Sequence, residues 1–460
     1  MREYVVMLNP FQLVSVKKLT GFQTENSHGV FKVSGVIPME KESEYMSLGL
    51  QEIETELIAI ADDQTAKTLI KGVITDFRID VFDSVRFMHL EITTGTFVMD
   101  RLPHTRTFQS EGITYEDMLT TATKAYGDAD FLMSVGASST ISGTVAQYQE
   151  TDWAFAKRLA SHFNTVLLPN SHLGGKKFTF GTPPNPARHT LTASDYMVGG
   201  VKGKINPKSG ESGPARDMFY YVVREQEIYR LGDIVNLNGQ ELYVSAIETE
   251  LDGVALYHNY TLKRKGDLYS PKVYNYALIG ASLDGKILAV EKDVVKITLN
   301  EDGNAESAGT RWYAYSTVYS SPDGTGWYCM PEPGDAVRLY FPTMDETQAY
   351  VISSAHEESG ARSNPDNKSI KNKQGKEALF MPDKVVITNN NGMSIVIDDA
   401  IGITFISDKD INFEANGLVQ LISGQVVSMI AADKVTLKQG ATTFTLDELV
   451  YMKGSQVRLD

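Results

Sequence analysis

The C-terminal part of the chain constrains the fold most strongly. From Asp383 to Asp460 there is no proline, tryptophan, histidine or cysteine, and short apolar runs recur between turns built from Asn, Asp or Gly, such as Asn389–Gly392. Short strands at near-regular spacing, joined by very short turns, predict a repeat-like β-structure. The predicted strands are Val385–Thr388, Ser394–Ile397, Ile403–Ile406, Ile411–Phe413, Val419–Ile422, Val426–Ile430, Val435–Leu437, Phe444–Leu446 and Gln456–Leu459.

This tail holds too little apolar mass for a closed core of its own. Each turn offers one to three apolar residues, and a strand meander of one chain leaves open edges that aggregate unless something covers them. Sister chains would cover both the apolar strip and the edges. The sequence therefore predicts an intertwined homotrimer in this region.

The preceding residues are also mainly β, and they are divided by composition. Alternating runs bounded by turn signals predict two β-barrels and a third unit of five strands in roughly eighty residues, which suits an OB-type barrel. Residues 357–375 are rich in Ser, Asn, Lys and Gly and form a predicted linker. The expected divisions are a first barrel at 1–105, a helix-containing segment at 106–197, a second barrel at 198–270, the OB-type barrel at 271–356, the linker at 357–375 and the strand repeat at 376–460.

Two helices are predicted in the segment between the first two barrels. Thr114 precedes an acidic turn, with apolar residues at helical spacing behind it, which is typical of a capped helix start. The second helix is expected after Thr151, with Trp153, Leu159 and other apolar residues on one face.

Charge and cysteine content restrict the partners. The chain has 43 Lys and Arg against 58 Asp and Glu, a formal net charge of −15, which argues against direct binding of nucleic acid through phosphates. The single Cys329 cannot form an internal disulfide, as expected for assembly in a reducing cytoplasm. The start of the chain supports neither a signal peptide nor a spanning helix. Any route out of the cell would then differ from ordinary secretion.

Four segments, in order, resemble the VgrG and phage late-control-D family of hub and spike proteins. The most specific runs from Tyr148 through Asp152 and Trp153 to Arg158 and Leu159, similar to a Tyr followed by Asp-Trp-x-Phe and Arg-Leu-Ala in that family. The other three are Gly72–Thr75 with Leu90–Ile92 and Arg106–Gln109, the turn containing Pro331, Gly334 and Asp335, and the entry Ile370–Gly375 with the Asp410–Phe413 repeat.

The resemblance implies a mainly β chain with two tube-type barrels, an inserted helical segment, an OB-fold and a triple-stranded β-helix needle. It implies a homotrimeric hub that adapts a sixfold tail tube to a threefold spike in a contractile injection system, and a needle that pierces the target envelope. The implied partners are a tail tube initiator or inner tube protein, baseplate wedge proteins, a small PAAR-like tip protein and the target cell envelope. The implied route is synthesis in the bacterial cytoplasm, assembly into a phage tail or tail-like particle, and delivery to the target cell on firing.

No catalytic, cofactor or metal site is predicted. Some spikes of this kind carry a lysozyme domain before the needle, but residues 357–382 are too few for a domain that holds the required Glu and Asp. The acidic pairs Asp62–Asp63, Asp128 with Asp130 and Asp398–Asp399 fit solvated turns better than metal or acid–base sites. The segment Asn300–Asn304 lacks the ligand spacing of a calcium loop. His104, His162, His172 and His189 show no metal-binding spacing, and no histidine follows His356 where a tip iron site would need a pair.

Two other functions remain open. A tailspike or receptor-binding protein with a carbohydrate-degrading solenoid would need a groove of aromatic residues, and only Phe380, Phe405, Phe413, Phe444 and Tyr451 follow the linker. A carrier of enzymatic cargo would have to hold its cargo non-covalently. The sequence does not distinguish a phage from a bacteriocin, a type VI apparatus or an extracellular injection system.

Overall fold

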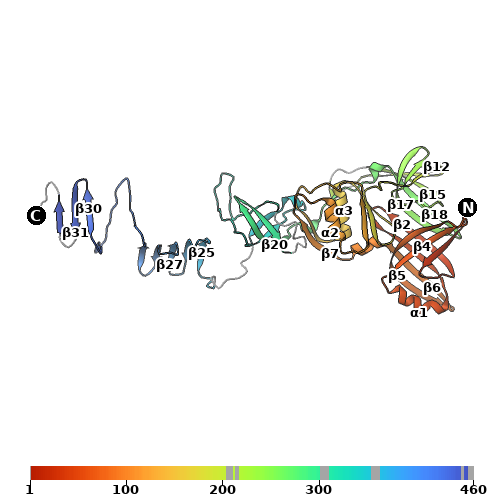
Figure 1. Ribbon diagram of the computed structural model, residues 1–460, viewed down its shortest axis with the longest axis horizontal. Coiled ribbons are helices and arrows are strands. Elements are labelled where there is room, and N and C mark those ends of the chain that lie inside the picture. The colour runs from red at the N-terminus through yellow and green to blue at the C-terminus, as the bar shows by residue number, and fades with distance from the viewer. Residues whose placement is uncertain are drawn as a thin grey trace. The chain divides into compact units, whose positions relative to one another are not determined.

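The computed structural model describes residues 2–203, 211–212, 217–300, 310–353, 363–446 and 450–453. The chain divides into two compact units, Met1–Glu357 and Glu358–Asp460. The first unit contains a large sheet, a helical segment and a smaller sheet (Figure 1). The second unit consists of short strands.

A mostly antiparallel sheet of twelve strands forms most of the first unit. Its main path runs β1-β4-β5-β6-β3-β2-β17-β18-β15-β13, and β16 and β12 branch from β17. The strands are β1 Tyr4–Asn9, β2 Ser15–Thr24, β3 Ser27–Ile37, β4 Glu54–Ala61, β5 Ala66–Phe82, β6 Val85–Thr94, β12 Arg188–Leu191, β13 Met197–Val201, β15 Met218–Glu225, β16 Ile234–Leu237, β17 Gln240–Asp252 and β18 Ala255–Lys263.

The two ranges predicted as barrels, 1–105 and 198–270, are joined in this sheet, because β2 pairs with β17 from Thr24 opposite Ala246 to Thr20 opposite Glu250. Glu3, the residue before β1, also forms a bridge with Ala255 of β18. Alternation of apolar residues indicates which face of a strand is buried, but it does not indicate which strand lies beside it.

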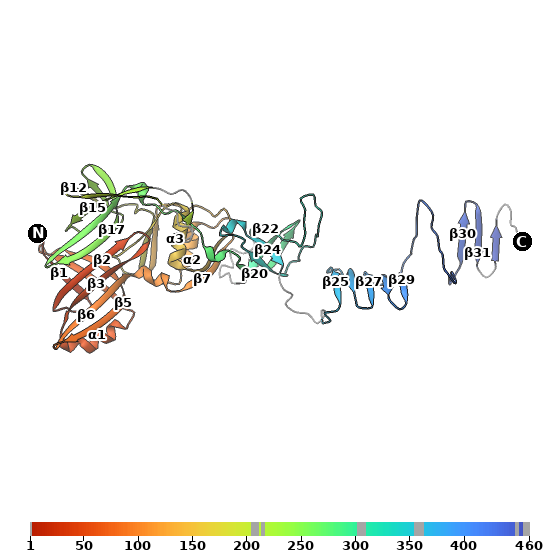
Figure 2. The ribbon, with the colours of Figure 1, turned by 180° about the vertical axis from the view of Figure 1, so that it is seen from behind.

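The helical segment packs between this sheet and the smaller one (Figure 2). Both predicted helices are present as α2 Tyr115–Thr123 and α3 Asp152–His162. Thr114 and Asp117 form a reciprocal capping box, and the Thr151 hydroxyl accepts a hydrogen bond from the Ala154 N–H. The remaining elements of the segment are β7 Pro103–Phe108 paired with β9 Val145–Thr151, and a sheet of β10 Leu167–Pro169, β11 Lys176–Phe180 and β8 Ala129–Met133.

Several short elements were not predicted. Helix α1 Glu42–Gly49 lies against β5 and buries only Tyr45. Strands β14 Glu211–Ser212 and β19 Lys272–Val273 pair with each other. Short 3-10 helices are η1 Met39–Lys41, η2 Gly95–Asp100, η4 Lys265–Asp267, η5 Tyr276–Leu278 and η7 Glu346–Gln348.

Five strands form the smaller sheet at the positions expected for the third β-unit. They are β20 Ser282–Glu291, β21 Val294–Leu299, β22 Tyr313–Ala314, β23 Ala336–Tyr340 and β24 Tyr350–Ser353, in the order β22-β21-β20-β23-β24. The two ends of this order meet, because Tyr315 forms a parallel bridge with Val351. Ile287, Ile297 and Leu339 are buried inside.

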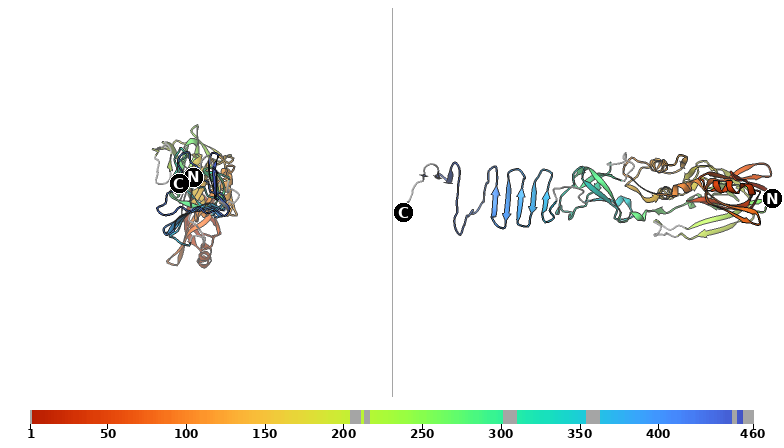
Figure 3. Two further views of the ribbon diagram at one scale, coloured as in Figure 1. Left: turned by 90° about the vertical axis from the view of Figure 1, so that its left-hand side faces the viewer. Right: turned by 90° about the horizontal axis from the view of Figure 1, so that it is seen from below.

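The second unit is a strand meander in which no side chain described between residues 363 and 445 is fully buried. Strands β25 Lys368–Lys371, β26 Glu377–Phe380, β27 Lys384–Thr388, β28 Ser394–Asp398 and β29 Gly402–Ile406 pair in sequence order (Figure 3). Strands β30 Val435–Gln439, β31 Thr442–Leu446 and β32 Val450–Lys453 form another three-stranded sheet.

Three predicted strands in the second unit are absent. Residues 411–413, 419–422 and 426–430 have no strand pairing, and their apolar side chains are exposed; Ile430 is 94% exposed. A strand requires a neighbouring strand to hydrogen-bond with, and these residues have none within the described chain. The predicted strand Gln456–Leu459 lies outside the described residues.

Gly72 tests the packing of the large sheet. A Cβ atom on Gly72 would lie 2.1 Å from the Thr93 carbonyl oxygen on the neighbouring strand. We expect Gly72→Ala to lower the free energy of unfolding by about 1–3 kcal/mol because the two backbones must separate. Gly127→Ala is the control, since a Cβ there meets nothing within 4 Å. Equal midpoints of thermal unfolding for the two variants would contradict the close approach.

Candidate functional site

The segment from Tyr148 to Leu159 forms a buried junction between the helical segment and the five-stranded sheet. Its centre is Arg158 on α3, whose side chain is 1% exposed. Its Nη1 lies 3.0 Å from Glu346 Oε1 of η7, and its Nη2 lies 2.9 Å from Glu150 Oε2. Nη2 also donates to the Ala146 carbonyl oxygen at 2.8 Å. One guanidinium therefore joins elements 188 residues apart in sequence.

Each charge at this junction is compensated. Burial alone would lower the pKa of Arg158, but the carboxylates of Glu150 and Glu346 raise it above its ordinary value. Burial raises the pKa of Glu346, an effect that Arg158 and the Ala146 N–H partly oppose. The Ala146 N–H donates to Glu346 Oε1 at 2.9 Å. Removing any one of these groups would leave a buried polar group without its partner.

Asp152 forms a second buried cluster at the start of α3. Its carboxylate accepts hydrogen bonds from Arg106 Nη1 at 2.5 Å, Gln147 Nε2 at 2.8 Å and the Tyr126 hydroxyl at 2.8 Å. His104 Nε2 lies 3.4 Å away. Burial, and then the bond to Asp152, raise the pKa of Tyr126. The cluster fixes β7, β9 and α3 together.

The aromatic and aliphatic residues of the same segment pack on either side. Trp153 is 1% exposed and contacts His28 and Phe178, which agrees with the predicted core position. Leu159 is fully buried in the same core. Tyr148 is partly buried against the core of the five-stranded sheet, and its carbonyl oxygen accepts from Asn275 Nδ2 at 2.8 Å.

The predicted residues Pro331, Gly334 and Asp335 are not part of this junction. They form a turn before β23, where Gly334 has a φ of +96° that favours glycine. The Gly334 N–H donates to the Ile287 carbonyl at 2.8 Å, and the Ile287 N–H donates to the Asp335 carbonyl at 2.9 Å. This turn therefore anchors to β20.

Glu346 and Glu150 were not singled out from the sequence. Glu150 lies inside the segment from Tyr148 to Leu159 that carries the family resemblance. The sequence, however, does not indicate whether a carboxylate is exposed or buried. Glu346 lies far along the chain in a polar stretch, and only the tertiary structure brings it to Arg158. A fully buried arginine demands a carboxylate partner, yet the sequence does not indicate which one.

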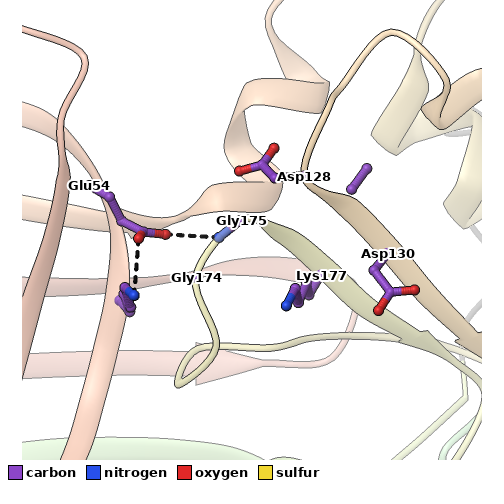
Figure 4. Close-up of a pocket in the computed structure, with 8 residues that line it drawn as sticks. Glu54, Asp128, Asp130, Gly174, Gly175 and Lys177 are labelled. Atoms are coloured by element: carbon purple, nitrogen blue, oxygen red, sulfur yellow. Dashed lines mark hydrogen bonds and ion pairs between the residues drawn. The ribbon is translucent and has the colours of Figure 1, made fainter.

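The other polar candidates have local partners. Glu54, Asp128 and Asp130 line an open pocket of about 460 Å³ with Gly174, Gly175 and Lys177 (Figure 4). Glu54 pairs with Lys71 at 3.1 Å and accepts from the Gly175 N–H at 2.9 Å. Asp128 pairs with Lys176 at 2.5 Å.

The remaining acidic pairs and histidines are dispersed. Asp62 and Asp63 contact Arg2, and Asp398 accepts from two backbone N–H groups of the following turn. His162 contacts the Tyr115 hydroxyl, and His189 contacts Asp233. No group of three or more metal-ligating side chains occurs among the described residues. Most of Asn300–Asn304, and His356, lie outside the described residues.

No family model and no curated protein matches this sequence. The fold, however, matches solved structures. A component of the type VI secretion system from E. coli, described as similar to bacteriophage T4 tail proteins, aligns at a TM-score of 0.51 and 11% identity. The alignment covers 75% of this chain and 99% of that chain.

The Francisella VgrG structures, solved in complex with PdpA, align over more of the chain. The lidless form aligns at a TM-score of 0.54 and 9% identity, covering 88% of this chain and 98% of that chain. The lidded form gives 0.55 and 9%, covering 88% and 80%. The chain therefore has the fold of these VgrG structures. At such low sequence identity the alignments show a shared fold, and they do not assign roles to individual residues. Within the described residues, no helix has the length and apolar run needed to cross a bilayer.

The buried junction makes Arg158 a sensitive position. We expect Arg158→Met to lower the free energy of unfolding of the first unit by about 3–5 kcal/mol, because Glu346 and Glu150 lose their counter-charge. Arg188→Met is the control, since Arg188 and Glu241 form an exposed pair whose loss costs at most about 1 kcal/mol.

A double-variant cycle then tests the specific pair. Arg158→Met combined with Glu346→Leu should recover part of the loss in denaturant unfolding, because no unpaired carboxylate remains at η7. Strict additivity of the two changes would argue against the Arg158–Glu346 interaction.

Proposed function

We propose that this chain is the structural hub and spike of a contractile injection system and acts as a homotrimer. The first unit would form the hub, with the five-stranded sheet as an OB-fold domain and the second unit as a triple-stranded β-helix needle. The fold alignment over most of the chain supports the hub and spike assignment. The meander β25–β29 supports the trimer. The observation that carries the proposal is the exposed apolar face of this sheet.

One face of β25–β29 is apolar on every strand. The register places Ile370, Ala378, Ile387, Ile395 and Phe405 in one row across the sheet, and Phe380, Val385, Ile397 and Ile403 in the next. Ile387, Ile403 and Phe405 are 53%, 65% and 54% exposed. The opposite face is mixed: Leu379, Val386 and Val396 form an apolar row there, and Ser369, Thr388, Ser394 and Thr404 are polar. A sheet with one apolar face exposed to water needs a cover.

Copies of the same chain are the cover that best fits this pattern. The uncovered strip continues through residues 411–430, where apolar side chains are exposed and no strand partner exists within the described chain. Three intertwined chains would supply both missing components, namely strand partners and an apolar interior. The resulting closed prism would suit piercing of a target envelope.

The OB-fold assignment is supported by the connectivity of the smaller sheet. Its strands, numbered one to five in chain order, lie in the order 3-2-1-4-5, and the third closes on the fifth through Tyr315 and Val351. A five-stranded barrel of this kind is the OB architecture. Its partners in the particle would be the tail tube and baseplate on the hub side, and a small tip protein at the needle.

No second function is favoured over this one. Phe380 and Phe405 lie in the apolar rows among isoleucines, whereas a sugar-binding groove would present aromatic rings beside polar groups. The proposed role is therefore mechanical and non-enzymatic. Digestion of peptidoglycan by the purified protein would contradict it.

The molar mass of the purified chain tests the trimer. At micromolar concentration, light scattering should give three times the 50.8 kDa of one chain. Deletion of residues 376–460 should weaken the assembly, seen as a lower mass on dilution and lost resistance to detergent and heat. A full-length monomer would overturn the proposed spike.

Adjacent residues on β29 separate the two faces of the sheet. We expect Ile403→Asp to weaken the trimer strongly, because it would bury a charge in the proposed interior. Thr404→Asp, on the opposite face of the same strand, is the matched control and should leave the mass unchanged. Analytical ultracentrifugation over a dilution series measures both, and the same behaviour in the two variants would exclude this face as the interface.

A further inference from the structure

A small cavity in the first unit lies where strands distant in sequence meet. Its volume is about 10 Å³, room for roughly one water molecule. β2 and β5 contribute to its wall from the N-terminal part of the large sheet, and β17 and β18 contribute from the later part. The loop after β10 and the segment before β16 complete the lining. The cavity therefore sits beside the β2–β17 pairing that unites the sheet.

His258 on β18 is the most deeply buried titratable group of this cavity. It is 2% exposed, and its Nδ1 lies 2.9 Å from the Thr249 hydroxyl of β17. Its Nε2 is buried and has no hydrogen-bond partner. A second histidine, His172, lines the same cavity from the loop after β10. A protonated His258 would place an unsolvated N–H⁺ at this position.

Burial, and then the neighbouring cations, oppose protonation of the two histidines. Burial lowers the pKa of His258 to about 4, and Lys67 on β5 adds to the effect. Burial lowers the pKa of His172 to about 4, and Arg230 adds to the effect. The carboxylates nearby have other partners: Glu56 accepts from Thr68, and Glu227 pairs with Lys67. The remaining titratable groups against His258 are Tyr229, Tyr260 and, opposite it in register, Glu225.

We propose that this cavity is an acid-sensitive joint, at which protonation of His258 beside His172 and Arg230 loosens the contact between β2–β5 and β17–β18. This acid sensitivity is a property of the large sheet and does not depend on the proposed hub function. It would make the large sheet open locally in an acidic compartment while the five-stranded sheet, which contains no histidine, stays closed.

The direction of the pH dependence follows from the linkage between proton binding and opening of the sheet. A histidine with a folded pKa below its ordinary value of 6.5 binds its proton better in the open state. Its stabilising contribution is complete above pH 6.5 and is lost as the pH falls from 6.5 towards 4. For these two pKa values, His258 alone makes opening at pH 5 about 30-fold more favourable than at pH 8.

Amide hydrogen exchange on the full-length protein tests the proposal. After correction for the intrinsic pH dependence of exchange, protection in residues 245–258 and 66–70 should fall at least about 30-fold between pH 8 and pH 5. Residues 282–299 of the five-stranded sheet serve as the internal reference and should not change. His258→Gln keeps a side-chain hydrogen bond to Thr249 possible, does not titrate, and should make the fall about 30-fold smaller.

His89→Gln is the matched control. His89 also lies on a strand of the large sheet, but its side chain is 32% exposed and lies 3.2 Å from Asp80. This variant should keep the wild-type pH response. A fall of the full wild-type size in His258→Gln, or a fall that is equal in the reference strands, would overturn the proposal. If His258→Gln does not fold, unchanged protection in the wild-type protein between pH 8 and pH 5 overturns it alone.

Discussion

The buried guanidinium of Arg158 is the constraint on which the arrangement of the first unit depends. It lies between Glu150, eight residues earlier, and Glu346 of η7, the 3-10 helix between β23 and β24 of the five-stranded sheet. Any separation of these elements would leave a charge in an apolar interior, which is far more costly than the loss of a surface pair. The ion pair therefore holds the sheet to the helical segment in one geometry, and Asp152 fixes the start of the same helix in a similar way.

The two units differ in how far their apolar side chains are buried. The first has continuous cores of its own, in which Phe31, Trp153 and Leu339 are fully or almost fully buried. The second has apolar rows without an interior. Such a division fits the proposal of a hub that would hold its geometry as one chain and a needle that would become stable when chains assemble. The proposed acid-sensitive cavity would add a local weakness to the large sheet.

Local sequence patterns predicted individual helices and strands. They did not predict which strands pair when these are far apart in the chain. Thr114 and Thr151 located both main helices because capping depends on neighbours in sequence. Alternation located most strands of both sheets in the first unit. It failed at residues 411–430, where the same alternation has no partner strand. It did not reveal that the two predicted barrel ranges are joined, because β2 and β17 are far apart in the chain. The resemblance around Trp153 located the segment that contains Arg158 and Glu150, but it did not identify Glu346 as their partner.

The sequence by itself determined the two main helices and most strands of the first unit, the apolar face of each, and that the C-terminal strands cannot enclose a core. These properties depend on residues within a few positions of one another. Only the tertiary structure decided that β2 pairs with β17, that Glu346 neutralises Arg158, and that His258 and His172 line one cavity. Those contacts join residues that are tens to hundreds of positions apart, and many alternative partners of the same chemistry occur along the chain.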